Sequence, residues 1–574
     1  MCRRMRHRGP DDQVVRTFGD ATLGFVRLSI IDLATGCQPL TSSDDIIAVV
    51  VNGEIYNHVE LREELLARGH RFRTRSDAEV VVHLYEEVGL DCLERLNGMF
   101  ALAVADTRTG EVHLARDRVG VKPLYWTLQG DRLAFASELP ALLQDPRITP
   151  ELDREGLAEL LTLTYLPAPR TPIANVAKLA PGTVLTWRAG RVRIRQWWRW
   201  PDPADPLGAH PGGDLGEQVR GLLVDAVRLQ LRSDVPVGVL LSGGVDSTAL
   251  LWAARELGST VPGYCVDFDE PDGDARYARL AGRVLGAEID ELPVDAAEAE
   301  RTLPGVVANL SEPIGDPAVL PSLMVCRAAA RHVRVLLSGT GADELWGGYG
   351  RYVLPGRDAR GVYVTELSVL PEREVRAALG LSSGPTPVQD RLEGLLSGPH
   401  SDADPPAARM YLDGCLSLPG DLLPLLDQTS MAVSIEARVP LLDHRLVELA
   451  AGIPGATRIP RGALKGLFRS ALRGCVPDAI LDRPKRGFNP PLAGWATTEL
   501  GATAQQLVTG PGGLTDSLLD RALVEQWLRP GAVSPGLRAL RLWSLLVLDL
   551  WCRRLADAGA PTTNSLADLL AGAA

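Results

Sequence analysis

A short apolar run that leads directly into a glycine-rich turn is the feature that most constrains the fold of this chain. Residues 235–241 read VPVGVLL, and SGGVDS follows at 242–247 without a break. A continuous apolar run is typical of a strand buried on both faces of a parallel sheet. The arrangement returns at residues 333–337, which lead into a second glycine-rich loop, SGTGADE, at 338–344. We therefore predict a parallel α/β sheet here.

The turn at 242–247 has the composition of a phosphate-binding loop. Gly243 and Gly244 let the backbone approach a ligand closely, and the N–H groups that begin the following helix favour an anion. Ser242 and Ser247 add hydroxyl donors. Asp246 would repel phosphate by itself, so we interpret it as a ligand of a bridging divalent cation. The plainer alternative is an ordinary strand–helix turn with a capping serine.

The second loop adds an acidic residue at an equivalent place. The carboxyl ends of strands in an open α/β sheet are where ligands bind. Asp343 would then join Asp246 in holding one Mg²⁺ ion. The alternative is that Asp343 and Glu344 only complement the dipole of a helix N-terminus.

These paired loops resemble the ATP-pyrophosphatase (PP-loop) domain of asparagine synthetases, and the resemblance extends over nearly the whole chain. Further motifs that carry it are Glu312-Pro313, Asp316-Pro317, LWGGY (345–349), residues 427–432 and 436–443, Lys465 with Arg469, and RPKRGF (483–488). The resemblance implies that a substrate carboxylate attacks the α-phosphate of ATP, forming an acyl-adenylate and pyrophosphate. An amine then displaces AMP.

The resemblance also implies roles for particular residues. Lys465, Asp246 and Asp343 would be catalytic, and the two aspartates would hold Mg²⁺. The ATP site would comprise Leu241, Ser242, Gly243, Gly244, Asp246, Ser247, Val266, Ser338 and Gly339. A solvated helix lysine near Arg469 is the plainer interpretation of Lys465. Arg483 and Lys485 suit either a phosphate-facing role or a surface basic cluster.

One departure concerns Thr340. The family often carries an acidic residue there, linked to formation of the acyl-adenylate. Thr is neither a general base nor a strong cation ligand at neutral pH. This departure weakens the case for aspartate as the substrate.

The first part of the chain resembles a class II, N-terminal-nucleophile glutamine amidotransferase. The motifs are HRGPD (7–11), RLSI (27–30), VNGEIYN (51–57), Ser76-Asp77 and RDRVGVKPLY (116–125). By this resemblance, Arg27 binds the glutamine carboxylate with its guanidinium fork, and Asp77 binds the ammonium. Asn52 and Gly53 stabilise an oxyanion, within a substrate loop that includes Glu54.

The expected nucleophile is the weak point of this resemblance. Cys2 has the formal position, but it precedes His7 by only five residues, where the family has a strand and a helix. We therefore interpret Cys2 as incidental. We expect either a truncated or misassigned N-terminus, or loss of glutaminase activity. Loss of a central strand would expose a sheet edge, so we expect a poorly stable first domain if the chain begins here.

The pattern of elements predicts two domains. Short apolar runs at 48–51, 100–104 and 133–136 predict strands, and residues 60–68 and 78–87 predict helices. The Pro- and Asp-rich residues 201–214 predict a linker. We predict an α+β N-terminal-nucleophile-type sandwich, incomplete at its start, over residues 1–205. An α/β parallel-sheet PP-loop domain with a helical C-terminal part follows over 215–574, with an insertion at 367–406.

Charge and cysteine content limit the partners. The formal net charge is −12, which disfavours binding to a nucleic-acid backbone. The most apolar stretch, 540–551, contains Arg541 and Asp549 and is too short to span a bilayer. The eight cysteines are scattered, which favours a reducing cytoplasm. We expect small-molecule substrates, namely ATP, glutamine or ammonia, and aspartate or another carboxylate; a homodimer stays open.

The sequence leaves four functions to distinguish. Most favoured is a carbon–nitrogen ligase that makes asparagine from aspartate with nitrogen from glutamine or ammonia. The second is a lactam- or amide-forming synthetase with an inactive glutaminase domain, which Thr340 and the missing nucleophile favour. The third is a non-catalytic regulatory homologue. A PP-loop enzyme acting on transfer RNA is disfavoured by the acidic net charge.

Overall fold

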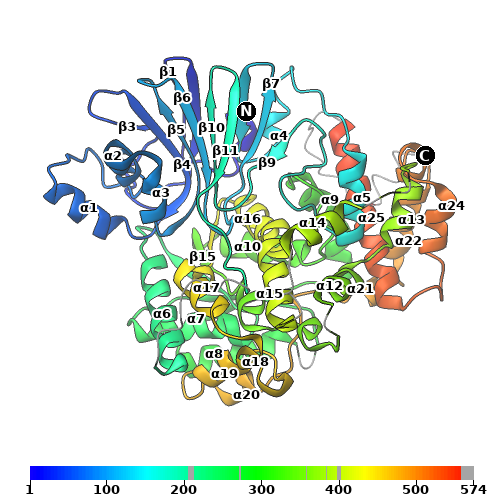
Figure 1. The fold of residues 1–574 in the computed structure, drawn as a ribbon. Coiled ribbons are helices and arrows are strands. Elements are labelled where there is room, and N and C mark those ends of the chain that lie inside the picture. Colours follow the sequence, from blue (N-terminus) through cyan, green and yellow to red (C-terminus); the bar gives the residue numbers. More distant parts are fainter. Residues whose placement is uncertain are drawn as a thin grey trace.

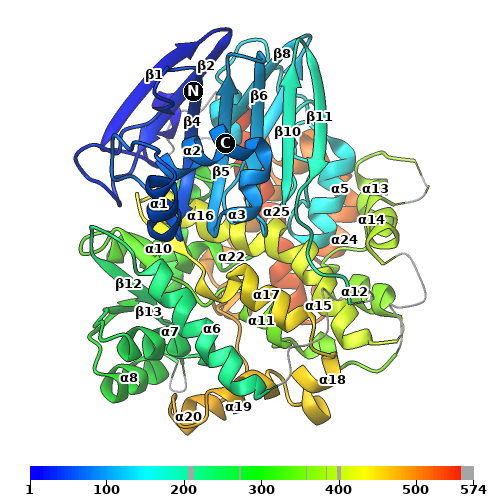
Figure 2. The same ribbon diagram turned by 60° about the vertical axis from the view of Figure 1, so that its left-hand side comes forward.

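The protein stacks a strand-rich N-terminal part on a helix-rich C-terminal part (Figures 1 and 2). The computed structural model describes residues 1–203, 213–270, 273–356, 358–382, 384, 386–396, 403–556 and 566. Most of the predicted linker, 204–212, lies outside the described residues.

The centre of the N-terminal part is an antiparallel sheet with strand order β11-β10-β6-β5-β4-β3. Its strands are β3 (Leu40–Thr41), β4 (Ile47–Ile55), β5 (Gly98–Asp106), β6 (Glu111–Arg116), β10 (Thr183–Arg188) and β11 (Arg191–Gln196). Side chains alternate between its faces. Val49 and Val51 of β4 pack with residues of the helices α1 (His58–Ala67), α2 (Glu79–Val88) and α3 (Cys92–Arg95).

Ala48 and Val50 point to the opposite face of β4. They pack with Phe18 and Leu23 from a separate antiparallel pair, β1 (Asp12–Phe18) and β2 (Ala21–Arg27). A third sheet, ordered β8-β7-β9, contains β7 (Tyr125–Gln129), β8 (Arg132–Ala136) and β9 (Ala177–Lys178). Within the described residues, β1 and β2 form a sheet of only two strands, so β2 is an edge strand. In the third sheet, β8 is likewise an edge strand.

The C-terminal part contains the predicted parallel sheet, with order β14-β13-β12-β15-β16 and every neighbouring pair parallel. Its strands are β12 (Val237–Leu240), β13 (Gly263–Asp267), β14 (Ile289–Pro293), β15 (Val335–Leu337) and β16 (Glu436–Arg438). Cys265 faces the core shared with α6 (Leu215–Gln230), α7 (Val245–Glu256) and α8 (Asp274–Leu285). Tyr264 and Val266 face α9 (Ala296–Ala308) and α10 (Val319–Ala329).

The rest of the C-terminal part is helical, as predicted. The helices are α11 (Ala342–Trp346), α12 (Ala359–Leu367), α13 (Glu372–Ala378), α14 (Pro387–Leu395), α15 (Pro405–Cys415), α16 (Leu423–Met431), α17 (His444–Ala451), α18 (Gly455–Arg458), α19 (Gly466–Ala471), α20 (Asp478–Leu481), α21 (Leu492–Trp495), α22 (Glu499–Thr509), α23 (Leu514–Ser517), α24 (Arg521–Trp527) and α25 (Pro535–Ala556). Two further helices, α4 (Leu139–Leu142) and α5 (Arg154–Leu163), precede the parallel sheet. None of the helices in the described ranges is both long and apolar enough to cross a membrane.

Charged side chains that are far apart in the sequence join the two parts. Arg8 donates from Nη1 to Asp427 Oδ2 at 2.8 Å and from Nη2 to Asp427 Oδ1 at 3.1 Å. Lys122 Nζ lies 3.2 Å from Asp427 Oδ1, and Arg8 also contacts Glu138. All four side chains are buried. Arg8 and Lys122, which belong to the N-terminal motifs, therefore help to hold the two parts together through Asp427.

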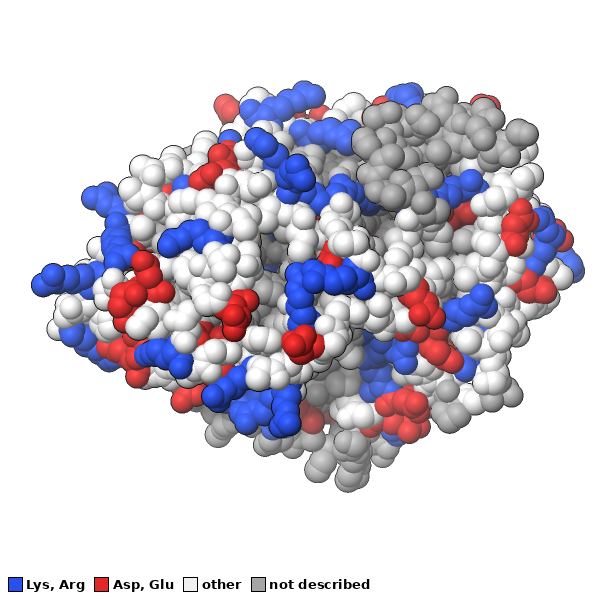
Figure 3. Space-filling view, turned by 90° about the horizontal axis from the view of Figure 1, so that it is seen from above, with Lys and Arg blue, Asp and Glu red and all other residues white. Residues whose placement is uncertain are grey.

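The surface seen from above carries both signs of charge (Figure 3). Lys and Arg side chains lie beside Asp and Glu side chains, with uncharged surface between them.

Candidate active sites

The two glycine-rich loops of the parallel sheet are in contact. A Cβ added to Gly339 would lie 2.9 Å from Asp246 Cβ. Gly243 has φ +65°, and a Cβ there would lie 2.6 Å from the backbone N of Ala278 on α8. Only glycine combines a left-handed backbone with such a close approach. The loops after β12 and β15 thus form one continuous ligand-facing edge.

Lys465 contacts both Asp246 and Asp343, the two aspartates predicted from the sequence to hold one Mg²⁺ ion. Its Nζ lies 2.6 Å from Asp246 Oδ2 and 2.7 Å from Asp343 Oδ1. Lys485 Nζ approaches Asp343 Oδ2 to 2.5 Å. Lys465 has a left-handed backbone, with φ +54°, a costly conformation that clusters at functional sites. The fold therefore brings together the three residues predicted to be catalytic.

Burial and ion pairing act against each other at these groups. Burial lowers the pKa of Lys465, but Asp246 and Asp343 outweigh it and raise the pKa, so Lys465 is charged. Burial raises the pKa of Asp343, but the ammonium groups of Lys465 and Lys485 hold it well below its usual range. Burial raises the pKa of Asp246 despite the opposing effect of Lys465.

A cavity of about 290 Å³ opens on one side of this cluster. Strand ends supply an apolar wall that includes Leu241, Tyr264 and Val266. Among the residues predicted to bind ATP, those that line the cavity are Leu241, Ser242, Asp246, Ser247, Val266, Ser338 and Gly339. An apolar cavity with a few convergent polar groups is typical of a small-molecule site.

A smaller cavity of about 100 Å³ adjoins it and is strongly basic. Lys465, Arg469, Arg483, Lys485 and Arg486 line it together with the loop residues Ser242, Gly244 and Asp246. Arg483 is buried and donates to Asp274 Oδ1 at 2.7 Å. Arg483 and Lys485 thus lie beside the glycine-rich loop, as a phosphate-facing role requires.

Glu344 is a site residue whose place the sequence did not reveal. It lines the larger cavity, is buried, and accepts a hydrogen bond from Tyr349 Oη at 2.7 Å. Its Oε2 has no hydrogen-bond partner among the described residues. Burial, with the nearby charge of Asp343, raises its pKa to about 7. Thr340 also lines this cavity, with its hydroxyl 2.9 Å from Ser338 Oγ.

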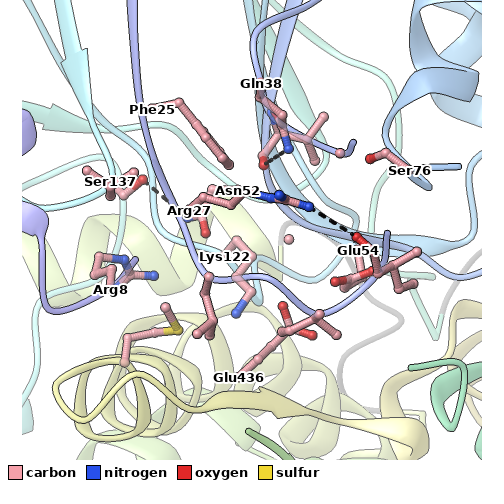
Figure 4. A pocket seen from close by; sticks show the side chains of 18 of the residues that line it. Arg8, Phe25, Arg27, Gln38, Asn52, Glu54, Ser76, Lys122, Ser137 and Glu436 are labelled. Carbon is pink, nitrogen blue, oxygen red and sulfur yellow. Dashed lines mark hydrogen bonds between the residues drawn. The ribbon is translucent and has the colours of Figure 1, made fainter. Parts of the chain in front are cut away.

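A separate cavity of about 110 Å³ lies in the N-terminal part, and its floor comes from the C-terminal part (Figure 4). All five predicted glutamine-binding residues line it: Arg27, Asn52, Gly53, Glu54 and Asp77. Arg27 Nη2 donates a hydrogen bond to the backbone carbonyl oxygen of Asp32 at 2.5 Å. The Asn52 amide donates to Ser137 Oγ at 3.2 Å. Glu436, from β16, approaches from the other part (Figure 4).

The backbone at Gly53 admits only glycine. Its φ is +133°, and a Cβ there would lie 2.0 Å from the Met99 carbonyl oxygen on β5. Glu54 and Asp77, near Gly53, are both buried. Burial is the largest cause that raises the pKa of Glu54, and the neighbouring carboxylates raise it further. Asp77 Oδ2 accepts from the Ile55 N–H at 2.8 Å. This acidic end of the cavity suits an ammonium group.

Cys2 does not take part in this cavity. It begins a short 3₁₀ helix, Cys2–Met5, and its Sγ would lie 2.5 Å from a Cβ added to Gly24 on β2. None of the described residues that line the cavity is a cysteine. The thiol therefore packs against β2 at Gly24, and Cys2 is not among the residues that line the cavity.

Comparisons with known proteins match both parts. The family described as asparagine synthase matches residues 218–553, and the glutamine amidotransferase domain matches residues 1–198. The chain belongs to the asparagine synthase family. A glutamine-hydrolyzing asparagine synthetase 1 of Bacillus subtilis is 32% identical, covering 95% of this chain and 91% of the relative.

Other relatives span most of the chain as well. The glutamine-hydrolyzing asparagine synthetase 3 of Bacillus subtilis is 31% identical, covering 91% of this chain and 88% of its own length. The glutamine-hydrolyzing asparagine synthetase 2 of Arabidopsis thaliana is 29% identical, covering 85% of this chain and 75% of its own length. The resemblance to the asparagine synthase family inferred from the motifs is thereby confirmed.

In this member of the family, some site residues could not be found from sequence. Gln38 is one: its side chain bonds both the N–H and the C=O of Val51, at 2.6 and 3.2 Å, and so fixes the strand that carries Asn52. Ser137, which contacts Asn52, follows an unremarkable apolar strand. Only the shared cavity reveals either residue. Gly243, by contrast, was predicted in the ATP site, and it supports the loop without lining either of the two cavities at the parallel sheet.

Proposed function

We propose that this protein forms amides with ATP through an acyl-adenylate, with aspartate as the carboxylate and asparagine as the product. The observation that carries the proposal is the sharing of the Lys465 ammonium by Asp246 and Asp343, between a basic cavity and an apolar one. Residues 215–574 would perform this ligase reaction with nitrogen from glutamine or ammonia, and residues 1–205 would bind glutamine in the cavity around Arg27 and Asp77.

The division of the site matches the two halves of ATP. The apolar strand ends at Leu241 and Val266 would hold the adenosine part. The basic cavity around Arg483 and Lys485 would hold the pyrophosphate, because guanidinium and ammonium groups bind phosphate oxygens strongly. In this arrangement the α-phosphate would lie near the junction of the two cavities.

Asp246 and Asp343 fit a Mg²⁺ ion by donor type. Carboxylate oxygens are the ligands this ion prefers, usually one or two of them with substrate phosphates. When bound there, Mg²⁺ would neutralise charge on the phosphate oxygens. Lys465 would keep both carboxylates ionised and in place, and would itself neutralise charge that develops on the leaving pyrophosphate.

The reaction would proceed in two displacements. A carboxylate oxygen of the substrate forms a bond to the α-phosphorus as the bond from phosphorus to the bridging oxygen breaks, and pyrophosphate leaves. The nitrogen of the amine then attacks the acyl carbon, and AMP leaves with the carboxylate oxygen. The nitrogen loses a proton in this second step.

Glu344 is the candidate to accept that proton. Its carboxyl lines the cavity, and a pKa of about 7 suits a general base at neutral pH. Burial is the largest cause that raises the pKa of the neighbouring Asp421, and the negative charges of Asp316 and Glu344 raise it further. A cluster of buried carboxyls beside the cavity favours a substrate with a cationic group, such as the ammonium of an amino acid.

A specific observation favours a second function. Thr340 lines the cavity where the family often has an acidic residue, and its hydroxyl contacts only Ser338 among the hydrogen bonds of the described side chains. In this alternative, the adenylate forms on another carboxylate, and an internal amine closes a lactam or amide.

An assay of pyrophosphate release separates the two functions. Purified protein receives ATP, Mg²⁺ and aspartate, with either ammonium or glutamine. Asparagine synthesis predicts aspartate-dependent pyrophosphate, with asparagine formed in equal amount. Absence of aspartate-dependent pyrophosphate under both conditions would favour the alternative substrate.

A further inference from the structure

A third cluster of ligand-type side chains lies on α2 and the loop before it, apart from both sites described above. His70 Nδ1 lies 3.2 Å from His83 Nδ1. Glu86 Oε2 lies 2.9 Å from His83 Nδ1 and 3.7 Å from His70 Nδ1. None of the three residues lines the cavities of the candidate active sites.

The size of this triangle matches one face of a metal coordination tetrahedron. Zinc bonds to His nitrogen and carboxylate oxygen are about 2.0–2.1 Å long, so neighbouring donors of a tetrahedral site are about 3.3 Å apart. The observed donor separations are 3.2, 2.9 and 3.7 Å. One ion at normal bond lengths can therefore reach all three atoms with small side-chain adjustments.

The far side of each imidazole ring faces a carboxylate. His70 Nε2 lies 3.0 Å from Glu87 Oε1, and His83 Nε2 lies 3.8 Å from Glu79 Oε1. Glu79 is fixed in turn by the backbone N–H of Thr74, at 2.8 Å. A metal-bound histidine commonly donates its other ring N–H to a carboxylate, which orients the ring and strengthens its basicity. The contact between His70 and Glu87 has the length of such a hydrogen bond, whereas His83 Nε2 has no hydrogen-bond partner among the described residues.

The surroundings combine rigidity with access. His83 is buried and packs edge-on against Phe72, with ring centroids 4.5 Å apart. The side chains of His70 and Glu86 are 19% and 28% exposed, which gives an ion a path from solvent. No Lys or Arg pairs with Glu86 in the described part of the chain, whereas Glu87 is paired with Arg68.

We propose that His70, His83 and Glu86 bind one divalent cation of the zinc type, with water completing the coordination. Two imidazoles and one carboxylate favour Zn²⁺ over Mg²⁺ or Ca²⁺, which take oxygen ligands. The cation would tie α2 to the loop that contains residues 70–78, and that loop leads to Ser76 and Asp77 at the N-terminal cavity. The alternative is a metal-free cluster held by hydrogen bonds between the rings and Glu86.

Titration of the full-length protein with Zn²⁺ and with Co²⁺ tests this proposal. We expect one equivalent of Zn²⁺ by calorimetry, and an absorption band typical of four-coordinate Co²⁺. His83→Ala and His70→Ala should each abolish the Co²⁺ band, whereas His332→Ala, at an exposed histidine elsewhere, should leave it unchanged. Glu87→Gln should weaken binding about 10- to 100-fold, because it removes the carboxylate behind His70.

Thermal unfolding provides a readout that does not depend on the absorption band. A ligand that binds only the folded state raises its stability, so Zn²⁺ should raise the Tm of the wild type and of His332→Ala but not of His70→Ala. Because His70 is partly exposed, its replacement leaves a foldable protein. Absence of a Co²⁺ band in the wild type, or equal binding by His70→Ala and the wild type, would overturn the proposal.

Discussion

Gly348 lies so close to Asp343 that a Cβ at position 348 would be 1.6 Å from Asp343 Oδ1. It would also lie 2.4 Å from Lys465 Cε. The absence of a side chain at this glycine therefore permits the contact between the aspartate and the lysine. Gly350, two positions further on, has nothing within 4 Å of an added Cβ.

The change Gly348→Ala should therefore strongly reduce nucleotide cleavage, because the methyl group must displace Asp343, Lys465 or both. We expect pyrophosphate release to fall by about 100-fold or more, the cost of losing a preorganised electrostatic group. Gly350→Ala should retain most of the activity. Equal activity of the two variants would show that the Asp343–Lys465 contact is dispensable.

Replacement of Asp246 tests its role in holding the cation and phosphates. Asp246→Ala should reduce pyrophosphate release by at least about 100-fold. It should also raise the concentration of Mg²⁺ needed for half-maximal rate. Asp290→Ala, at an exposed position on the edge strand β14, serves as the control. A full rate in Asp246→Ala would exclude the proposed role.

The buried carboxyl of Glu344 should make stability depend on pH. In the folded protein its pKa is raised from 4.5 to about 7, so between these values the folded state holds a proton that the unfolded state has lost. Stability then falls as the pH rises through this window. Glu344→Gln keeps the shape and removes this fall, which urea unfolding at several pH values would measure.

The same residue should shape the pH profile of the reaction. The rate of amide formation should rise through about pH 7 in the wild type as Glu344 loses its proton, and Glu344→Gln should be slower by about 100-fold. If the wild type and Glu344→Gln show the same pH dependence of stability and the same pH dependence of rate, Glu344 has neither of the proposed roles.

The buried charges between the two parts of the chain should matter for stability. Asp427→Asn leaves the Arg8 guanidinium and the Lys122 ammonium buried without their shared carboxylate. Breaking a buried ion pair in this way costs about 3–5 kcal/mol. Glu64→Gln removes an exposed partner of Arg68 and should cost less than about 1 kcal/mol. Similar unfolding midpoints for both variants would contradict this difference.

Cys2 should be dispensable for any use of glutamine. Its thiol lies against Gly24 and outside the cavity that contains Arg27 and Asn52. Cys2→Ser should therefore leave the ammonium-dependent rate of asparagine formation unchanged, and any glutamine-dependent rate should equal that of the wild type, measured side by side. Loss of only the glutamine-dependent rate in Cys2→Ser would identify Cys2 as the nucleophile.

Much of the parallel-sheet site was predictable because its signals are local. The apolar run before Ser242 and the glycines after it specify a strand, a turn and a helix start within a few residues. The approach of Lys465 is not local, since more than 200 residues separate it from Asp246. Its placement came from the family resemblance, and only the fold shows that it bridges the two aspartates.

Other features depended on packing that no short pattern encodes. Asp427 and Arg8 are each unexceptional charged residues in the sequence, and their pairing requires the two parts to be docked. The function of Glu344 was hidden because an acidic residue at a helix start has an ordinary explanation in the helix dipole. The His70–His83 cluster was also missed, because its members lie 13 positions apart and join through a loop.

The most direct test of the account follows one oxygen atom. Aspartate labelled with ¹⁸O in its side-chain carboxylate is incubated with ATP, Mg²⁺, ammonium and the protein, and the AMP is examined by mass spectrometry. Attack of the carboxylate on the α-phosphate predicts one ¹⁸O atom in each AMP, with pyrophosphate formed in equal amount. Formation of ADP and phosphate, or of AMP without label during asparagine synthesis, would contradict the acyl-adenylate.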